Sequence, residues 1–192
     1  MPEDQKPLTD ESVVGEALRN KEAFGVLVER YQAPLARYLK RLGVWRTEDA
    51  EDVLQNVFLK AYRNLNDFDP RLKFSAWIYR ITHNEAVSFF RSNAARPEGA
   101  LIDDAELVLE HLRAEIDIER SADQGLTAER LSRALAKIDT KYRDAIVLRF
   151  FEERSYEEMS DILQVPLGTV ATLLNRAKKR LHAVLSTDPK NV

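Results

Sequence analysis

The residues best suited to chemistry lie near the C-terminus, in the stretch GTVATLLNRAKKRL of residues 168–181. At 100° per residue, Val170, Leu174, Ala177 and Leu181 form one apolar stripe of a helix. The opposite side carries groups that can hydrogen-bond the edges of bases or pair with phosphates. The candidates for contact with DNA are Thr172, Asn175, Arg176 and Lys179.

A shorter helix is predicted immediately before this one, in SYEEMSDIL of residues 155–163. Ser155 and Glu158 match a capping box, and Pro166 and Gly168 introduce the second helix. Two helices joined by a short turn are typical of a helix-turn-helix, whose second helix lies in the major groove. An ordinary helical hairpin is the alternative, because Lys and Arg also stabilise the C-terminal end of a helix.

A second candidate site lies in FSAWIYRITHNEAVSFFRSN of residues 74–93. As a helix, it places Trp77, Ile78, Ile81 and Phe89 on an arc suited to a core, and a second arc combines aromatic and basic side chains. Such a mixture suits unpaired bases, which stack on aromatic rings while arginine pairs with the backbone. Packing under another element is the alternative reading of the same aromatic residues. The members of the second arc are Tyr79, His83 and Phe90, bordered by Arg80 and Arg91.

The charges of the chain are unevenly distributed, although the net charge is only −3 and the pI about 5.7. Residues 71–96 hold five basic residues and one acidic residue, and residues 97–125 hold nine acidic residues and two basic ones. Residues 168–181 hold four basic residues and no acidic one, so two positive segments are separated by an acidic connector. We hypothesise that this connector either lies along a basic channel of polymerase or shields the protein's own DNA-binding faces, the latter through Asp103, Asp104 and Glu106.

Several classes of protein and site are disfavoured by composition. The chain has no cysteine, which excludes disulfides and thiolate metal sites and favours a reducing compartment, so we expect a cytoplasmic protein. No apolar run approaches the length of a membrane span, and the N-terminus has no signal-peptide core. The three histidines lack ligand spacing, and no P-loop or dinucleotide fingerprint is present, so no enzyme activity, metal or cofactor is expected.

The sequence predicts an all-α fold of two small helical domains joined by an acidic linker. In the N-terminal half, Thr9 or Asp10 caps a first helix, a second runs from about Glu22 to Gly43, and Thr47 caps a third. A fourth begins near Ser75 and ends near residue 93. In the C-terminal half, helices are expected after three further caps: Thr127, Asp139 and Ser155.

The third predicted helix is amphipathic, with a buried stripe at the spacing i, i+3, i+4, i+7 and a polar opposite side. The stripe is Ala50, Val53, Leu54, Val57, Phe58 and Ala61, and the polar side shows Asp52, Gln55 and Asn56. The chain resembles the extracytoplasmic-function sigma factors of bacterial RNA polymerase in four segments that follow one another in the family's order. These are DAEDVLQNVFLKAYRNL, FSAWIYRITHN, the acidic connector, and the segment from LSRALAKIDTKYRDAIVLRFFEE to the helix-turn-helix.

This resemblance implies a promoter-specific initiation factor in two parts. Residues 20–95 correspond to region two, which binds polymerase and opens the minus-10 element, and residues 127–186 to region four, which reads the minus-35 element. Residues 1–19 form an N-terminal tail and first helix, residues 96–126 the linker and residues 187–192 a tail. The implied partners are core RNA polymerase, promoter DNA and an anti-sigma factor.

The resemblance also implies roles for individual residues. Asp52, Gln55 and Asn56 match the positions that bind the clamp helices of the largest polymerase subunit. The loop from Asp67 to Phe74 matches the segment that captures a flipped base. The candidates around it are Phe68, Arg71, Lys73 and Asn84.

The chain departs from the family pattern at several positions. Asn56 replaces a glutamate, Ser88 an aspartate and Gln164 a frequent turn glycine, while the recognition helix has Ala171 and Leu173 where Lys and Arg are common. The alternative function is a stand-alone helix-turn-helix regulator whose N-terminal half binds a ligand or dimerises. Such a regulator would bind a palindromic duplex without polymerase.

Overall fold

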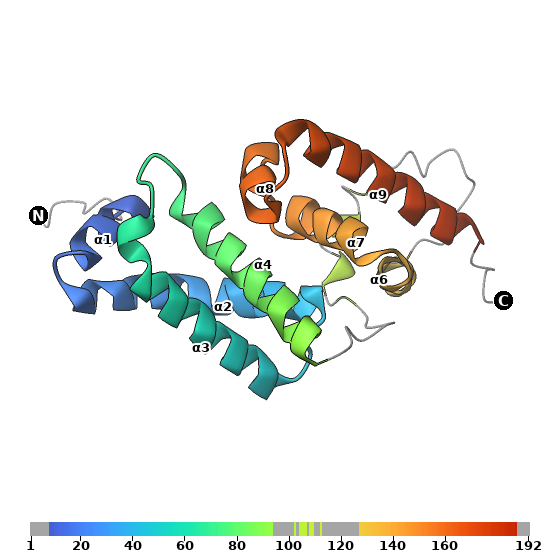
Figure 1. The fold of residues 1–192 in the computed structure, drawn as a ribbon. Helices are drawn as coiled ribbons and strands as arrows, with labels where there is room; N and C mark the ends of the chain where they lie inside the picture. Colours follow the sequence, from blue (N-terminus) through green and yellow to red (C-terminus); the bar gives the residue numbers. More distant parts are fainter. Residues whose placement is uncertain are drawn as a thin grey trace, which may run out of the picture.

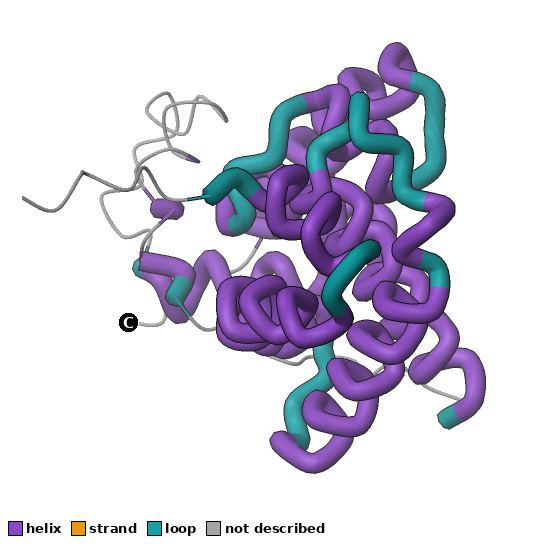
Figure 2. Tube along the Cα trace, turned by 90° about the vertical axis from the view of Figure 1, so that its left-hand side faces the viewer, coloured by secondary structure: helices purple, strands orange, loops and turns teal. Residues whose placement is uncertain are grey.

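A computed structural model describes residues 8–93, 102, 104–106, 108–109, 112 and 127–187. Over these residues the chain forms helices and connecting loops, and no strand occurs in them (Figures 1 and 2). The helices gather into an N-terminal lobe, α1–α4, and a C-terminal lobe, α6–α9 (Figure 1). The predicted all-α fold with two helical domains is therefore confirmed.

The N-terminal lobe packs α2, α3 and α4 against one another, with α1 across one end (Figure 1). Its elements, in order, are α1 Asp10–Ala17, the 3-10 turn η1 Lys21–Ala23, α2 Phe24–Leu42, α3 Thr47–Arg63, the 3-10 turn η2 Leu65–Asp67 and α4 Phe74–Ser92.

The ends of these helices follow local chemistry in most places. The hydroxyl of Thr9 accepts a hydrogen bond from the Ser12 N–H at 3.2 Å, as expected of an N-cap. Gly43 ends α2 with φ of 111°, a left-handed conformation that favours glycine. The prediction that Thr47 caps α3 is wrong. Arg46 holds the N-cap position in an extended conformation, and Thr47 is already helical.

The C-terminal lobe contains α6 Ala128–Lys137, α7 Thr140–Ile146, the π-helical turn η4 Val147–Phe151, α8 Tyr156–Leu163 and α9 Leu167–Thr187. The Thr127 hydroxyl caps α6, and both hydrogen bonds of the predicted Ser155–Glu158 capping box are present. Asp139 stands at the N-cap of α7, but its side chain makes no capping bond to the helix.

The turn between α8 and α9 closes on Gln164, whose φ of 54° is left-handed. This is the position where the family frequently has glycine. A side chain with a Cβ costs roughly 1–2 kcal/mol in this conformation. The turn is nevertheless formed, because the Ser160 hydroxyl donates to the carbonyl of Val165 at 2.6 Å and Val165 N–H donates to Ser160 O at 3.2 Å.

The described part of the connector is bound to both lobes. Ile102 N–H donates a hydrogen bond to the Ser132 hydroxyl in α6, and the carboxylate of Asp104 pairs with Arg41 in α2 at 3.0 Å. Ala105, Val108 and Leu112 are helical and buried, and Leu109 is helical and half-buried. Leu107 lies outside the described residues. The described residues of the connector therefore contribute apolar side chains to the common core.

Candidate nucleic-acid interface

Helix α9 presents the polar face that its sequence predicts. Val170, Leu174, Ala177 and Leu181 are buried against the rest of the C-terminal lobe. The opposite side is open to solvent, with only the Thr172 hydroxyl turned inward to donate to Gly168 O at 3.1 Å. Its exposed members are Thr172, Asn175, Arg176 and Lys179. The four side chains thus form one accessible surface, and their contact with DNA stays a prediction.

The aromatic residue proposed for base capture belongs to the core in this structure. Phe68 is 6% exposed, and its ring lies 5.7 Å from that of Phe74 and 5.5 Å from that of Trp77. To stack on a nucleobase, this ring would have to leave its aromatic cluster with Phe74 and Trp77. The sequence pattern did not reveal this, because a phenylalanine in a loop suits either environment.

The rest of the loop is organised by one ion pair. The Asp69 carboxylate accepts hydrogen bonds from the Arg71 backbone N–H at 3.0 Å and from its guanidinium Nε at 2.9 Å and Nη2 at 2.6 Å. Both side chains stand at the surface, with that of Arg71 87% exposed. The charge of Arg71 is therefore available to a phosphate only in competition with Asp69.

This pairing predicts a measurable titration. Hydrogen bonds from the Arg71 side chain and backbone lower the pKa of Asp69 to about 2. Because the folded-state pKa is depressed, the pair stabilises the loop fully above the unfolded pKa of about 3.9, and this is lost as pH falls through about 2. In Arg71→Ala, carboxyl-detected NMR should find the Asp69 pKa raised toward 3.9 or so. Arg91→Ala should leave it unchanged; equal values in both variants would contradict the assignment.

Three further candidates at the start of α4 and in its N-terminal half contact acidic side chains of the C-terminal lobe. Lys73 Nζ lies 3.1 Å from Glu158 Oε1, and Arg80 Nη1 lies 2.5 Å from Asp161 Oδ1. Tyr79 is 1% exposed and donates its hydroxyl to Glu152 Oε2 at 2.8 Å. These contacts join α4 to η4 and α8, which lie side by side in Figure 1.

The environment of Tyr79 explains its protonation state. Burial and the nearby charge of Glu152 raise the pKa of Tyr79 well above its ordinary value, so the phenol stays protonated and donates a hydrogen bond to the carboxylate. The guanidinium of Arg154 lies over the same ring, 4.0 Å from its centre. Neither face of this ring is open to a base in this conformation. The alternative reading, in which this arc packs under another element, therefore holds for Tyr79.

The other two predicted contacts on α4, Asn84 and Arg91, are exposed. His83, from the same helix, is half-buried and lies 3.1 Å from the hydroxyl of Tyr38 through its Nδ1. Among the residues that the structure describes, no group of three or more His, Asp or Glu side chains could hold a metal ion. The accessible part of α4 is therefore its C-terminal half.

The deepest contact between the lobes centres on one buried ion pair. Arg41 Nη1 lies 2.7 Å from Glu152 Oε1, and the two side chains are only 7% and 6% exposed. The Arg41 guanidinium also pairs with Asp104 and lies over the Phe151 ring at 5.1 Å. Sequence reasoning missed Arg41, Glu152, Arg154 and Asp161, because each lies more than 60 residues from the residues it contacts across the lobes and nothing local marks it. The hypothesis that the connector shields the DNA faces is also not supported by Asp104, which pairs with Arg41 instead.

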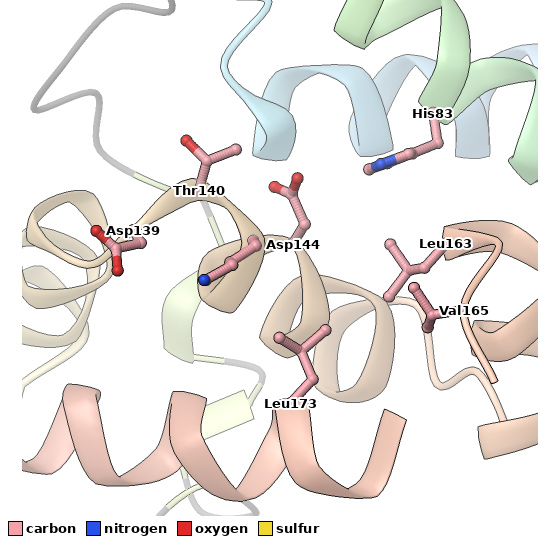
Figure 3. Close-up of a pocket in the computed structure, with 8 residues that line it drawn as sticks. His83, Asp139, Thr140, Asp144, Leu163, Val165 and Leu173 are labelled. Atoms are coloured by element: carbon pink, nitrogen blue, oxygen red, sulfur yellow. The ribbon is translucent and has the colours of Figure 1, made fainter. Parts of the chain in front are cut away.

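An open cleft of about 490 Å³ is lined by His83 of the N-terminal lobe and by residues of the C-terminal lobe (Figure 3). His83 of α4 points into it from one side, and Leu163 at the end of α8, Val165 in the following turn and Leu173 of α9 line the other side (Figure 3). Leu173 is half-buried, as its position at the edge of the inner stripe predicts. Helix α4 packs against α8, and among the described residues it has no comparable contact with α9.

The polar side of α3 is exposed as predicted. Asp52, Gln55 and Asn56 are all accessible, while Ala50, Val53, Val57 and Ala61 are buried beneath them. Leu59 and Tyr62 add exposed apolar surface to the same helix. A mixed polar and apolar face of this kind suits a protein partner better than DNA.

Comparison with known families accounts for both lobes. Residues 27–96 match the family model of sigma-70 region 2, and residues 128–181 that of sigma-70 region 4. The ECF RNA polymerase sigma-E factor of Haemophilus influenzae is 36% identical over 91% of this chain and 94% of its own length. The chain belongs to the extracytoplasmic-function sigma factors.

Other members of the family are similar over nearly the whole chain. The RNA polymerase sigma factor CnrH of Cupriavidus metallidurans is 32% identical over 88% of this chain and 90% of its own. The solved structure of CnrH in complex with the cytosolic domain of CnrY superposes with a TM-score of 0.66 at 29% identity, covering 94% of this chain and 99% of that one. RpoE of Bartonella quintana, solved with the anti-sigma factor NepR, shares the fold at 22% identity and a TM-score of 0.59, covering 86% of this chain and 98% of its own.

This sigma factor is therefore an alternative sigma factor that directs promoter-specific transcription initiation. Because both lobes match sigma regions, a stand-alone regulator with an unrelated N-terminal domain is set aside. No helix among the described residues is long and apolar enough to cross a membrane.

Proposed function

We propose that the two lobes divide promoter recognition between them. Helix α9 reads the minus-35 duplex through Thr172, Asn175, Arg176 and Lys179. The N-terminal lobe opens the minus-10 element through the loop before α4 and through α4 itself, using Phe68, Arg71, Lys73, Tyr79, Arg80, Asn84 and Arg91. The observation that carries the proposal is the exposed polar and cationic face of α9 above a fully buried stripe.

The proposed polymerase-binding surface is the accessible side of α3 with Asp52, Gln55 and Asn56. We further propose that the chain acts in the cytoplasm, performs no bond chemistry of its own, and is held inactive by an anti-sigma factor. Support for this last partner comes from two similar proteins of the family, each solved in complex with a second protein: CnrH with CnrY and RpoE with NepR.

Run-off transcription with core RNA polymerase of the host bacterium tests the function directly. A library of templates with randomised minus-35 and minus-10 segments should yield transcripts from a defined subset when the chain is added. Sequencing of that subset gives the promoter. The proposal fails if core polymerase with the chain produces no promoter-dependent transcript from any member of the library.

The polymerase surface is tested by Asp52→Ala combined with Gln55→Ala. Loss of two polar contacts, one of them charged, should weaken retention on immobilised core polymerase by at least about tenfold. Glu29→Ala with Gln32→Ala is the matched control, since it removes an exposed acid and an exposed amide at the same spacing from α2. Equal retention of the two double variants would place the binding surface elsewhere.

A further inference from the structure

The acidic face of α8 occupies cationic side chains that the proposed function assigns to promoter DNA. Glu158 and Asp161 stand three residues apart, on one face of the helix, and engage Lys73 and Arg80 of the N-terminal lobe. Glu152, just before α8, holds the hydroxyl of Tyr79. Three of the proposed minus-10 contacts are therefore paired with the other lobe at once.

A carboxylate is a close chemical substitute for a backbone phosphate in this setting. Both are anionic oxygen acceptors, and both form charge-assisted hydrogen bonds with Lys and Arg. Burial alone would raise the pKa of Glu158, but hydrogen bonds from the Ser155 N–H and Lys73 outweigh it and hold the pKa below its usual value. Glu158 is thus a full negative charge at neutral pH.

We propose that α8 acts as an internal competitor of minus-10 DNA, so that the free sigma factor rests in a closed state. In that state Lys73, Tyr79 and Arg80 are paired with Glu158, Glu152 and Asp161, and promoter melting requires α8 to leave α4. The inference rests on the proposed role of α4 in minus-10 binding. The minus-35 surface on α9 is not masked, because Thr172, Asn175, Arg176 and Lys179 remain exposed in the same closed state.

The composition of the contact makes it reversible. The Lys73 side chain is 69% exposed, and such solvent-exposed ion pairs contribute little to stability. Among the described residues, Asp161 Oδ2 and the Nε atoms of Arg41 and Arg154 are buried without a hydrogen-bond partner. A buried polar atom without a hydrogen bond costs free energy, so these three atoms destabilise the closed state. DNA and polymerase that offer these groups better partners can therefore displace α8.

The first measurement is the distance between the lobes. The chain has no cysteine, so Ala33→Cys in α2 and Ala183→Cys in α9 give two exposed and unique sites for spin labels. Electron–electron resonance should show one narrow distance in this background. Glu158→Gln with Asp161→Asn should broaden the distribution and shift it to longer distances. Gln keeps the capping box of α8, so the helix itself stays intact.

Two controls separate closure from general effects of charge. Glu153→Gln with Glu157→Gln removes the same two charges from exposed positions of the same segment and should leave the distance unchanged. Arg80→Asp and Asp161→Arg should each open the lobes alone, and the combined charge swap should close them again. A distance distribution that is the same in the parent, in Glu158→Gln/Asp161→Asn and in Arg80→Asp would overturn the closed state.

The second measurement is binding of a fluorescent 20-nucleotide single strand of random sequence, followed by anisotropy. The apparent affinity of a site is reduced by the fraction of chains in which it is open. If the parent is open in about a tenth of molecules, Glu158→Gln/Asp161→Asn should bind roughly tenfold tighter than the charge-matched control. High salt should reduce this difference in affinity between the two variants, because salt screens the ion pairs that hold the parent closed.

The outcomes distinguish this inference from the proposed function. Unchanged distances overturn the closed state, even if run-off transcription succeeds. Longer distances without tighter strand binding overturn the competition, because the uncovered face is then not the DNA-binding one and the assignment of Lys73, Tyr79 and Arg80 is wrong. The closed state and the minus-10 assignment are both supported if Glu158→Gln/Asp161→Asn shows longer distances and tighter strand binding and the charge-matched control Glu153→Gln/Glu157→Gln shows neither.

Discussion

Replacement of Arg176 and Lys179 by alanine should reduce transcription from a promoter selected by the wild-type holoenzyme by at least about 30-fold. Each good contact with a base or phosphate contributes roughly 1–3 kcal/mol, and 1.4 kcal/mol or so corresponds to a factor of ten. Both side chains project from the exposed face of α9 and their removal leaves its buried stripe intact. The loss should therefore appear in activity and minus-35 binding, with the unfolding midpoint unchanged.

A conservative change separates base reading from phosphate pairing at the same position. Arg176→Lys keeps the charge but loses the planar fork that matches a guanine edge. If Arg176 reads a base, this variant should stay impaired and should tolerate base changes at one promoter position. Activity close to wild type would assign the residue to a phosphate, and full activity of the double alanine variant would mean that another face of α9 meets the DNA.

Phe74→Ala should lower the free energy of unfolding by about 3–5 kcal/mol, measured by urea denaturation. The Phe74 side chain is 1% exposed, and its ring contacts those of Tyr31, Phe68 and Trp77 at centroid distances of 5.4–5.7 Å. Its backbone N–H also donates to Glu11 Oε1 at 3.2 Å, which ties α4 to α1. The residue therefore fixes the start of α4 and the loop before it.

The matched variant is Phe74→Leu, which keeps most of the buried volume but loses the ring contacts. It should cost clearly less than alanine and should retain transcription, because the loop keeps its anchor. A stability for Phe74→Ala within 1 kcal/mol or so of wild type would show that the aromatic cluster does not hold the lobe together. Loss of transcription in Phe74→Leu at normal stability would instead indicate a direct role of the ring.

The face of α9 could be predicted from sequence because helical periodicity alone determines it. Val170, Leu174, Ala177 and Leu181 can only be buried together, which leaves Arg176 and Lys179 outside. The capping box at Ser155 and the stop at Gly43 are equally local, since each depends on a few adjacent residues. Predictions of this kind require no knowledge of what the helix packs against.

Helical periodicity could not predict the environments of Tyr79 and Phe68, because these depend on contacts with residues distant in the sequence. Helix α4 has apolar residues on two arcs, and periodicity identifies both without saying which one meets the core and which a partner. The residue that decides the environment of Tyr79 is Glu152, 73 positions away. The prediction that Thr47 caps α3 was wrong by one residue. Arg46, whose backbone is extended, holds the N-cap position, and helix boundaries of this kind are uncertain by a residue or two.

The anchoring of the connector sets the length of the tether between the lobes. Residues 94–126 separate α4 from the cap of α6, but Ile102 is already hydrogen-bonded to Ser132 of the C-terminal lobe. From Asn93 to Ile102 the chain can extend roughly 30 Å at most. While this anchor holds, the lobes cannot separate further, and a short tether keeps each at a high effective concentration for the other. Release of Ile102, Val108 and Leu112 from the core would therefore act as a second step of opening, one that lengthens the reach between the two DNA-binding surfaces.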